Sequence, residues 1–111
     1  MIEAIISALA LCVLVLMSLR ANRRFNQHAR LPMQWSLNGS VNWTAPRQIA
    51  LAFTPVLAGL TLAAVVWLTT ALTPRPGQEG FAIPSLIFVA LVFVAAHTFH
   101  LWLIRKSIRE S

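Results

Sequence analysis

The residues whose types and spacing could do chemistry are two histidines near the end of the chain. His97 and His100 stand three positions apart, so a helix would place both imidazoles on one face. Such a pair could ligate a haem or another pigment, and ionisable residues inside an apolar span are functional candidates. A metal site needs further ligands, which the neighbouring sequence does not provide, so we expect no metal. The alternative is that both histidines pack within the protein or reach the membrane interface.

The rest of the sequence offers few candidate residues for chemistry. Cys12 is the single cysteine and stands in an apolar run, where it fits a small packing residue better than a nucleophile. One cysteine also excludes an intramolecular disulfide. No nucleophile stands out beside a base, and no glycine-rich phosphate loop is present. We therefore predict no catalytic residues, no enzyme activity, no bound cofactor and no small-molecule substrate.

The elements that must position these residues follow from the composition. Of 111 residues, 58% are hydrophobic and 11% are charged, whereas a soluble domain carries about 25% charged residues. Three apolar runs approach the roughly 20 residues that cross a bilayer as a helix, and they lack the alternation of barrel strands. We predict an all-α integral membrane protein, a single domain over 1–111. Its expected parts are a helix over about 3–21, an interfacial loop over 22–46, a helix over about 47–73, a loop over 74–81, a helix over about 82–105 and a basic tail over 106–111.

The basic residues predict the orientation of the helices. Lys and Arg collect on the cytoplasmic side of membrane proteins. The first loop and the tail hold eight of them, against Arg75 alone in the second loop. The eight are Arg20, Arg23, Arg24, Arg30, Arg47, Arg105, Lys106 and Arg109. We expect the N-terminus outside, with the first loop and the C-terminus in the cytoplasm. This asymmetry accounts for the net charge of +6, so we expect no nucleic-acid partner.

The stretch QWSLNGSVNW in the first loop predicts a short β-hairpin. Asn38 and Gly39 favour a two-residue turn in which both residues have positive φ. Such a turn would place Trp35 opposite Asn42. A two-stranded hairpin is marginal in water, so we expect it to lie on the membrane interface, where Trp35 and Trp43 would bury their rings and keep their N–H groups among headgroups. The alternative is an irregular loop with two interfacial tryptophans.

These residues carry a resemblance. The pattern of Pro32, Trp35, Asn38-Gly39 and Asn42-Trp43, with a basic residue at Arg47 leading into the next helix, resembles the N-terminal domain of unknown function of SdpI-type bacterial membrane proteins. The resemblance covers roughly residues 5 to 72 and implies a bacterial cytoplasmic (inner) membrane location. Family members include an immunity protein against a secreted toxin that also takes part in signalling.

The chain departs from that family in three ways. Gln34 stands where relatives typically have His, and Asn42 stands where they typically have Asp. Both replacements keep hydrogen-bonding shape and remove the ionisable group, which suits a structural tie but not proton or metal chemistry. The SdpI domain that follows in full-length relatives is absent.

What remains is contact with lipid and with other proteins. Gly59 and Ala63 on the second helix, and Ala4, Ala8 and Cys12 on the first, are spaced like faces that let helices approach closely. We predict an accessory subunit that packs on other membrane subunits, with its tryptophan loop and Arg23, Arg24 and Arg47 at the contact. An immunity or signalling protein is the alternative, and a pigment binder using His97 or His100 is a third.

Overall fold

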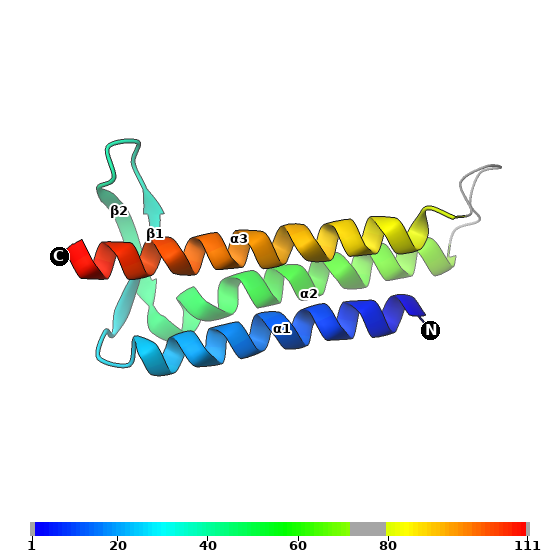
Figure 1. The fold of residues 1–111 in the computed structure, drawn as a ribbon, viewed down its shortest axis with the longest axis horizontal. Coiled ribbons are helices and arrows are strands. Elements are labelled where there is room, and N and C mark those ends of the chain that lie inside the picture. Colours follow the sequence, from blue (N-terminus) through cyan, green and yellow to red (C-terminus); the bar gives the residue numbers. More distant parts are fainter. Residues whose placement is uncertain (1, 72–79, 111) are drawn as a thin grey trace.

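The structure is a computed structural model and describes residues 2–71 and 80–110. Three long helices are joined, between the first and the second, by a two-stranded hairpin (Figure 1). In chain order the elements are α1 (Ile2–Arg24), β1 (Arg30–Trp35), β2 (Val41–Pro46), α2 (Arg47–Ala71) and α3 (Ala82–Glu110).

All three helices are long and apolar enough to cross a membrane. At a rise of 1.5 Å per residue the 23 residues of α1 reach about 35 Å, which exceeds the roughly 30 Å of bilayer hydrocarbon. Large apolar side chains lie exposed along each helix, as lipid-facing surfaces require. The predicted class, a multi-pass membrane protein with a hairpin after its first helix, is therefore confirmed.

The predicted boundaries can be compared with the helices where the chain is described. The helix α3 continues to Glu110, through most of the stretch expected as a basic tail. Arg75 and most of the connecting loop expected over 74–81 lie outside the described residues, as do residues 72 and 73 of the second predicted span.

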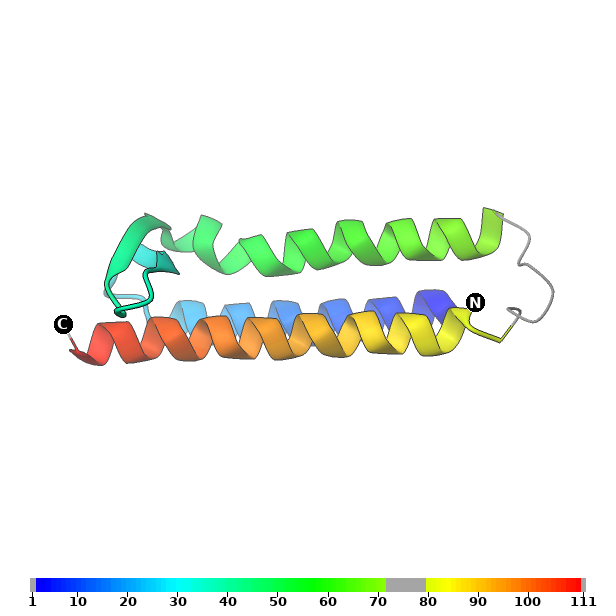
Figure 2. The same cartoon turned by 90° about the horizontal axis from the view of Figure 1, so that it is seen from above.

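The helices form a triangular bundle in which each contacts the other two. Figure 2 shows α2 on one side of the bundle and α1 with α3 on the other. The hairpin and the C-terminal end of α3 lie at one end of the bundle, and the N-terminal end of α1 lies at the other (Figure 1). The helix segments that hold the counted arginines of α1 and α3 therefore lie at the hairpin end.

The hairpin is antiparallel, but its turn differs from the prediction. The Ser36 N–H donates to the Ser40 carbonyl over 2.8 Å, and the Gly39 N–H donates to the Ser36 carbonyl over 2.9 Å. The connecting loop thus has three residues, 37–39, and Trp35 lies opposite Val41. The predicted two-residue turn, with Trp35 opposite Asn42, is wrong.

A side-chain interaction explains the longer loop. The Asn38 Oδ1 accepts hydrogen bonds from the Ser40 N–H over 3.1 Å and from the Ser40 Oγ over 2.7 Å. This local bond satisfies Asn38 without a left-handed backbone. Gly39 alone takes that conformation, with φ of 89°, and no other described residue has a positive φ. A glycine in the left-handed region is characteristic of three-residue hairpin loops.

The end of the helical bundle supports the hairpin. Leu31 of β1 and Ala45 of β2 are buried against the ends of the helices. The cluster that they join also contains Ala21, Phe25, Ala50, Leu51 and Ile104. A hairpin too short to fold alone is thus stabilised by a shared apolar core with all three helices.

Candidate functional site

The polar centre of the bundle is a chain of hydrogen bonds that joins all three helices. Pro55 lies inside α2 and has no N–H, so the carbonyl four residues before it, at Leu51, loses its partner within the helix. The Ser18 Oγ of α1 donates to this carbonyl over 2.7 Å. The same Oγ lies 2.8 Å from the His97 Nε2 of α3. One serine therefore connects α2 and α3 to α1.

These bonds fix the tautomer of His97. A serine hydroxyl has one proton, and Ser18 donates it to Leu51, because a carbonyl can only accept. The His97 Nε2 must therefore carry a proton and donate it to Ser18. The His97 Nδ1 is buried without a hydrogen bond, and the whole residue is fully buried. Ligation of a haem through Nε2 would require His97 to leave Ser18.

His100 lies one turn further along α3 and packs against the hairpin. Its ring is 5.8 Å from the Trp35 ring, centroid to centroid, in an edge-to-face arrangement of 79°. The Trp35 Nε1 donates to the Ser107 Oγ over 2.6 Å. The indole N–H therefore bonds to α3, and the position of Trp35 at the membrane interface stays a prediction. The two histidines are brought to the same helix face, as expected, but with different neighbours.

The hairpin residues of the family-like pattern are tied to one another. The Trp43 Nε1 donates to the Gln34 Oε1 across the strands over 2.6 Å. The Ser36 Oγ donates to the Asn42 Oδ1. Both amides therefore act as acceptors that hold the two strands together, which is the structural tie expected for uncharged replacements. The Trp43 side chain is about half exposed (49%).

Arg47 joins the start of α2 to the end of α1. Its Nε donates to the Asn22 Oδ1 over 2.7 Å, and one terminal nitrogen donates to the carbonyls of Asn26 and His28 over 3.0 and 2.9 Å. Its backbone N–H donates to the Ala29 carbonyl over 2.9 Å. A planar guanidinium with several donors suits this task, because it bonds three acceptors at once. Arg47 therefore fixes the loop within the chain.

The remaining predicted contact residues lie in varied places. Arg23 and Arg24 are exposed at the end of α1. Gly59 faces α1, where a Cβ would lie 3.5 Å from a methyl group of Leu11. Ala63 is exposed on α2, and Cys12 is exposed on α1. Of the two small residues on α2, Gly59 thus serves packing within the bundle and Ala63 faces outward.

The arrangement as a whole joins the three helices and the hairpin through polar side chains. Ser18, Trp35 and Arg47 engage in helix-to-helix or hairpin-to-helix bonds, while the His97 Nδ1 and the His100 Nε2 are buried without a hydrogen bond. Among the described residues, no group of three or more His, Cys, Asp or Glu side chains is placed to hold a metal. We call this site the polar junction of the three helices and the hairpin.

Sequence reasoning missed Ser18, Ser107 and Asn22, the partners that complete this junction. A signal existed for one of them. Pro55 predicts a freed carbonyl one turn before it, and Ser18 is a polar residue within an apolar run. Nothing in the sequence sets Ser107 or Asn22 apart from other polar residues near helix ends.

Comparison with known proteins adds no relative. No family model matches the chain, and neither a curated protein nor a solved structure matches it significantly. The resemblance of the loop to SdpI-type proteins therefore stays a prediction.

Proposed function

We propose that the protein is a small, non-catalytic accessory subunit of a larger bacterial membrane complex. Its helices would pack on other subunits, while the polar junction keeps the bundle and hairpin in a fixed shape. Support comes from the use of the buried polar groups, since Ser18, His97 and Trp35 bond to neighbouring elements of the same chain. A role in contact fits these bonds better than a role in chemistry.

The observation that carries the proposal is an exposed line of small residues on α1. Ala4, Ala8 and Cys12 stand four residues apart, and all three are exposed. Small residues at this spacing let a second helix approach closely, and in lipid such packing replaces the hydrophobic effect as a source of association. Within the bundle, Gly59 already allows close packing of α2 on α1, against Leu11. The line on α1 is therefore available to a helix of another subunit.

We further propose the bacterial cytoplasmic membrane as the location, with the N-terminus outside and the hairpin end in the cytoplasm. The support is the gathering of basic residues on α1, α3 and the hairpin at one end of the bundle. Cationic side chains resist translocation, so this end would stay inside.

Cys12 allows a direct test, because it is the single cysteine of the chain and lies on the proposed contact line. A photo-crosslinker attached to Cys12 in native membranes should capture one membrane protein in stoichiometric amount. In the control, Cys12→Ser is combined with Leu91→Cys, which places the same reagent at an exposed site of α3 at similar depth. Identical adducts from both positions, or adducts with lipid alone, would contradict the proposal.

A second variant tests the packing itself. Ala8 is exposed, so Ala8→Leu leaves the bundle interior unchanged and adds bulk only to the outer face of α1. We expect the partner to be lost in mild detergent while the thermal stability of the isolated chain stays the same. Retention of the partner would place the contact elsewhere.

The hairpin favours a second candidate function, an SdpI-like immunity or signalling protein. The supporting observation is that Gln34 and Asn42, at the positions of the family's His and Asp, both hold the hairpin together. Expression in toxin-sensitive bacteria is the test. Protection that is lost with Gln34→Ala, but retained with Gln34→His, would favour this candidate over the accessory subunit.

A further inference from the structure

We propose that a groove between α1 and α3, at the hairpin end of the bundle, binds one anionic phospholipid. Arg24 of α1 and Arg105 of α3 would hold its phosphate. The groove has a volume of about 900 Å³, which lies within the roughly 300–1,000 Å³ of typical small-ligand sites. It lies beside the polar junction and uses none of the residues that form it.

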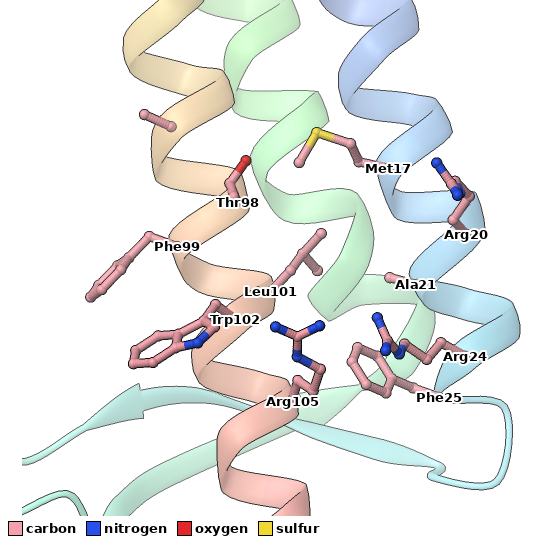
Figure 3. Close-up of a pocket in the computed structure, with 11 residues that line it drawn as sticks. Met17, Arg20, Ala21, Arg24, Phe25, Thr98, Phe99, Leu101, Trp102 and Arg105 are labelled. Atoms are coloured by element: carbon pink, nitrogen blue, oxygen red, sulfur yellow. The ribbon is translucent and has the colours of Figure 1, made fainter.

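Charge gives the first argument. Figure 3 shows the side chains of Arg24 and Arg105 reaching toward one another from the two helices, with Trp102 and Phe25 beside them. Arg20 lines the same groove one turn earlier on α1. Like charges that face one another near a membrane repel unless an anion lies between them. Among the described side chains the acidic one is Glu3, at the opposite end of α1. An anion held between the two arginines would therefore come from outside the described part of the chain.

The shape of the groove gives the second argument. Toward the middle of the bundle its walls are mostly apolar, with Met17 and Ala21 on α1 and Ala95 and Leu101 on α3, and with Arg20 and Thr98 as the polar residues of this part. A phospholipid carries its charge at one end and hydrocarbon at the other, so its polarity follows that of the groove. A free phosphate would fill only the arginine end. Basic pockets between transmembrane helices on the cytoplasmic side are typical sites for anionic headgroups.

Aromatic residues mark the depth of the headgroup. The Phe99 and Trp102 rings stack with centroids 6.0 Å apart, and the Lys106 Nζ lies 5.2 Å from the Trp102 ring centroid. Tryptophan with a neighbouring cation is characteristic of the boundary between acyl chains and headgroups. Trp102 lines the groove at the level of Arg105, so the phosphate of a lipid in that leaflet would lie beside both arginines.

The test is native mass spectrometry of the full chain released from nanodiscs that hold equal parts of phosphatidylcholine and phosphatidylglycerol. We expect one phosphatidylglycerol to remain bound, in preference to phosphatidylcholine by roughly tenfold or more, since two arginines contact its headgroup. In Arg24→Gln/Arg105→Gln the preference should fall several-fold. The matched control Arg23→Gln/Arg109→Gln removes two exposed charges from the same helix ends, outside the groove, and should keep most of the preference.

Three results would overturn the proposal. The first is an equal retention of the two lipids by the unaltered chain. The second is an equal loss of preference in the two double variants, which would indicate general attraction to the basic end. The third is displacement of phosphatidylglycerol by inorganic phosphate, which would assign the arginines to a soluble anion. Circular dichroism of each variant checks that the helices are intact, so a loss of lipid cannot be confused with unfolding.

Discussion

Replacing Ser18 with alanine should reveal what the polar junction contributes to stability. The substitution removes the donor to the Leu51 carbonyl and the acceptor of the His97 Nε2 proton. Pro55 takes away the helical donor for the Leu51 carbonyl, whereas the fully buried His97 also lies near the Leu14 carbonyl of α1. Ser18→Ala would therefore leave the Leu51 carbonyl without a hydrogen bond in an apolar surrounding and would remove the bond between Ser18 and His97.

The expected magnitude follows from these two groups. Hydrogen bonds between transmembrane helices contribute about 0.6 kcal/mol on average and up to about 1.7 kcal/mol. A buried polar group left without a partner costs about 1–3 kcal/mol. We therefore expect Ser18→Ala to lower the free energy of unfolding by about 2 kcal/mol. That change corresponds to a factor of roughly 30 in the ratio of folded to unfolded protein.

The assay is reversible unfolding in mixed micelles with increasing denaturing detergent, followed by tryptophan fluorescence. Ser7→Ala on the same helix is the matched control, because Ser7 is buried and its hydroxyl has no partner, so it should cost nothing. Pro55→Ala supplies a second background, in which an alanine N–H at position 55 can bond to the Leu51 carbonyl. There, Ser18→Ala should cost only about 1 kcal/mol, since only the bond between Ser18 and His97 is lost. The reasoning is refuted by equal costs for Ser18→Ala in the two backgrounds, or by equal costs for Ser18→Ala and Ser7→Ala.

Three further predictions concern the hairpin and its attachment. Gly39→Val should cost about 1–3 kcal/mol, because a β-branched residue is strained at φ of 89°; an unchanged thermal midpoint would contradict this. Trp35→Phe should cost about 1 kcal/mol by removing the donor to Ser107, and the cost should vanish in a Ser107→Ala background; additive costs in that cycle would show that the bond is unimportant. Arg47→Lys should speed hydrogen exchange of the amides in the loop between α1 and β1, because one ammonium cannot bond all the acceptors that the guanidinium reaches. Unchanged protection factors would show that backbone hydrogen bonds alone hold this loop in place.

The helices and the place of the hairpin could be predicted because each depends on a local signal. Long apolar runs leave few alternatives to helices in a bilayer, and Asn38-Gly39 marks a turn wherever it stands. The turn type was wrong because the signal is shared by two-residue and three-residue loops. The choice between them depended on the bonds from Ser40 to the Asn38 side chain, which compete with a left-handed backbone at Asn38.

The polar junction could not be predicted because it depends on how the helices are rotated about their axes. The apolar residues of α1 are spread around the helix, so their pattern does not indicate which face meets α3. Ser18 and His97 meet only when both helices turn these residues inward, 79 positions apart in the chain. The contact of Trp35 with α3 could not be predicted for the same reason. An indole has an apolar ring and a polar N–H, so it suits a lipid interface or a pocket on a helix. The bond from Trp35 to Ser107 depends on the position of α3, which the sequence does not indicate.

The docking of the hairpin on α3 has a consequence for how the chain is made. The hairpin is synthesised before α3, yet the Trp35 indole N–H donates its hydrogen bond to Ser107, 72 residues later. Until α3 has inserted, Ser18 lacks His97 and the hairpin lacks the helix on which Trp35 rests. An insertion intermediate with two helices would therefore expose a loosely held loop to proteases on its side of the membrane. Insertion of the third helix forms the Ser18–His97 and Trp35–Ser107 contacts together. Resistance of the loop to cleavage would therefore report that all three helices have been inserted and packed.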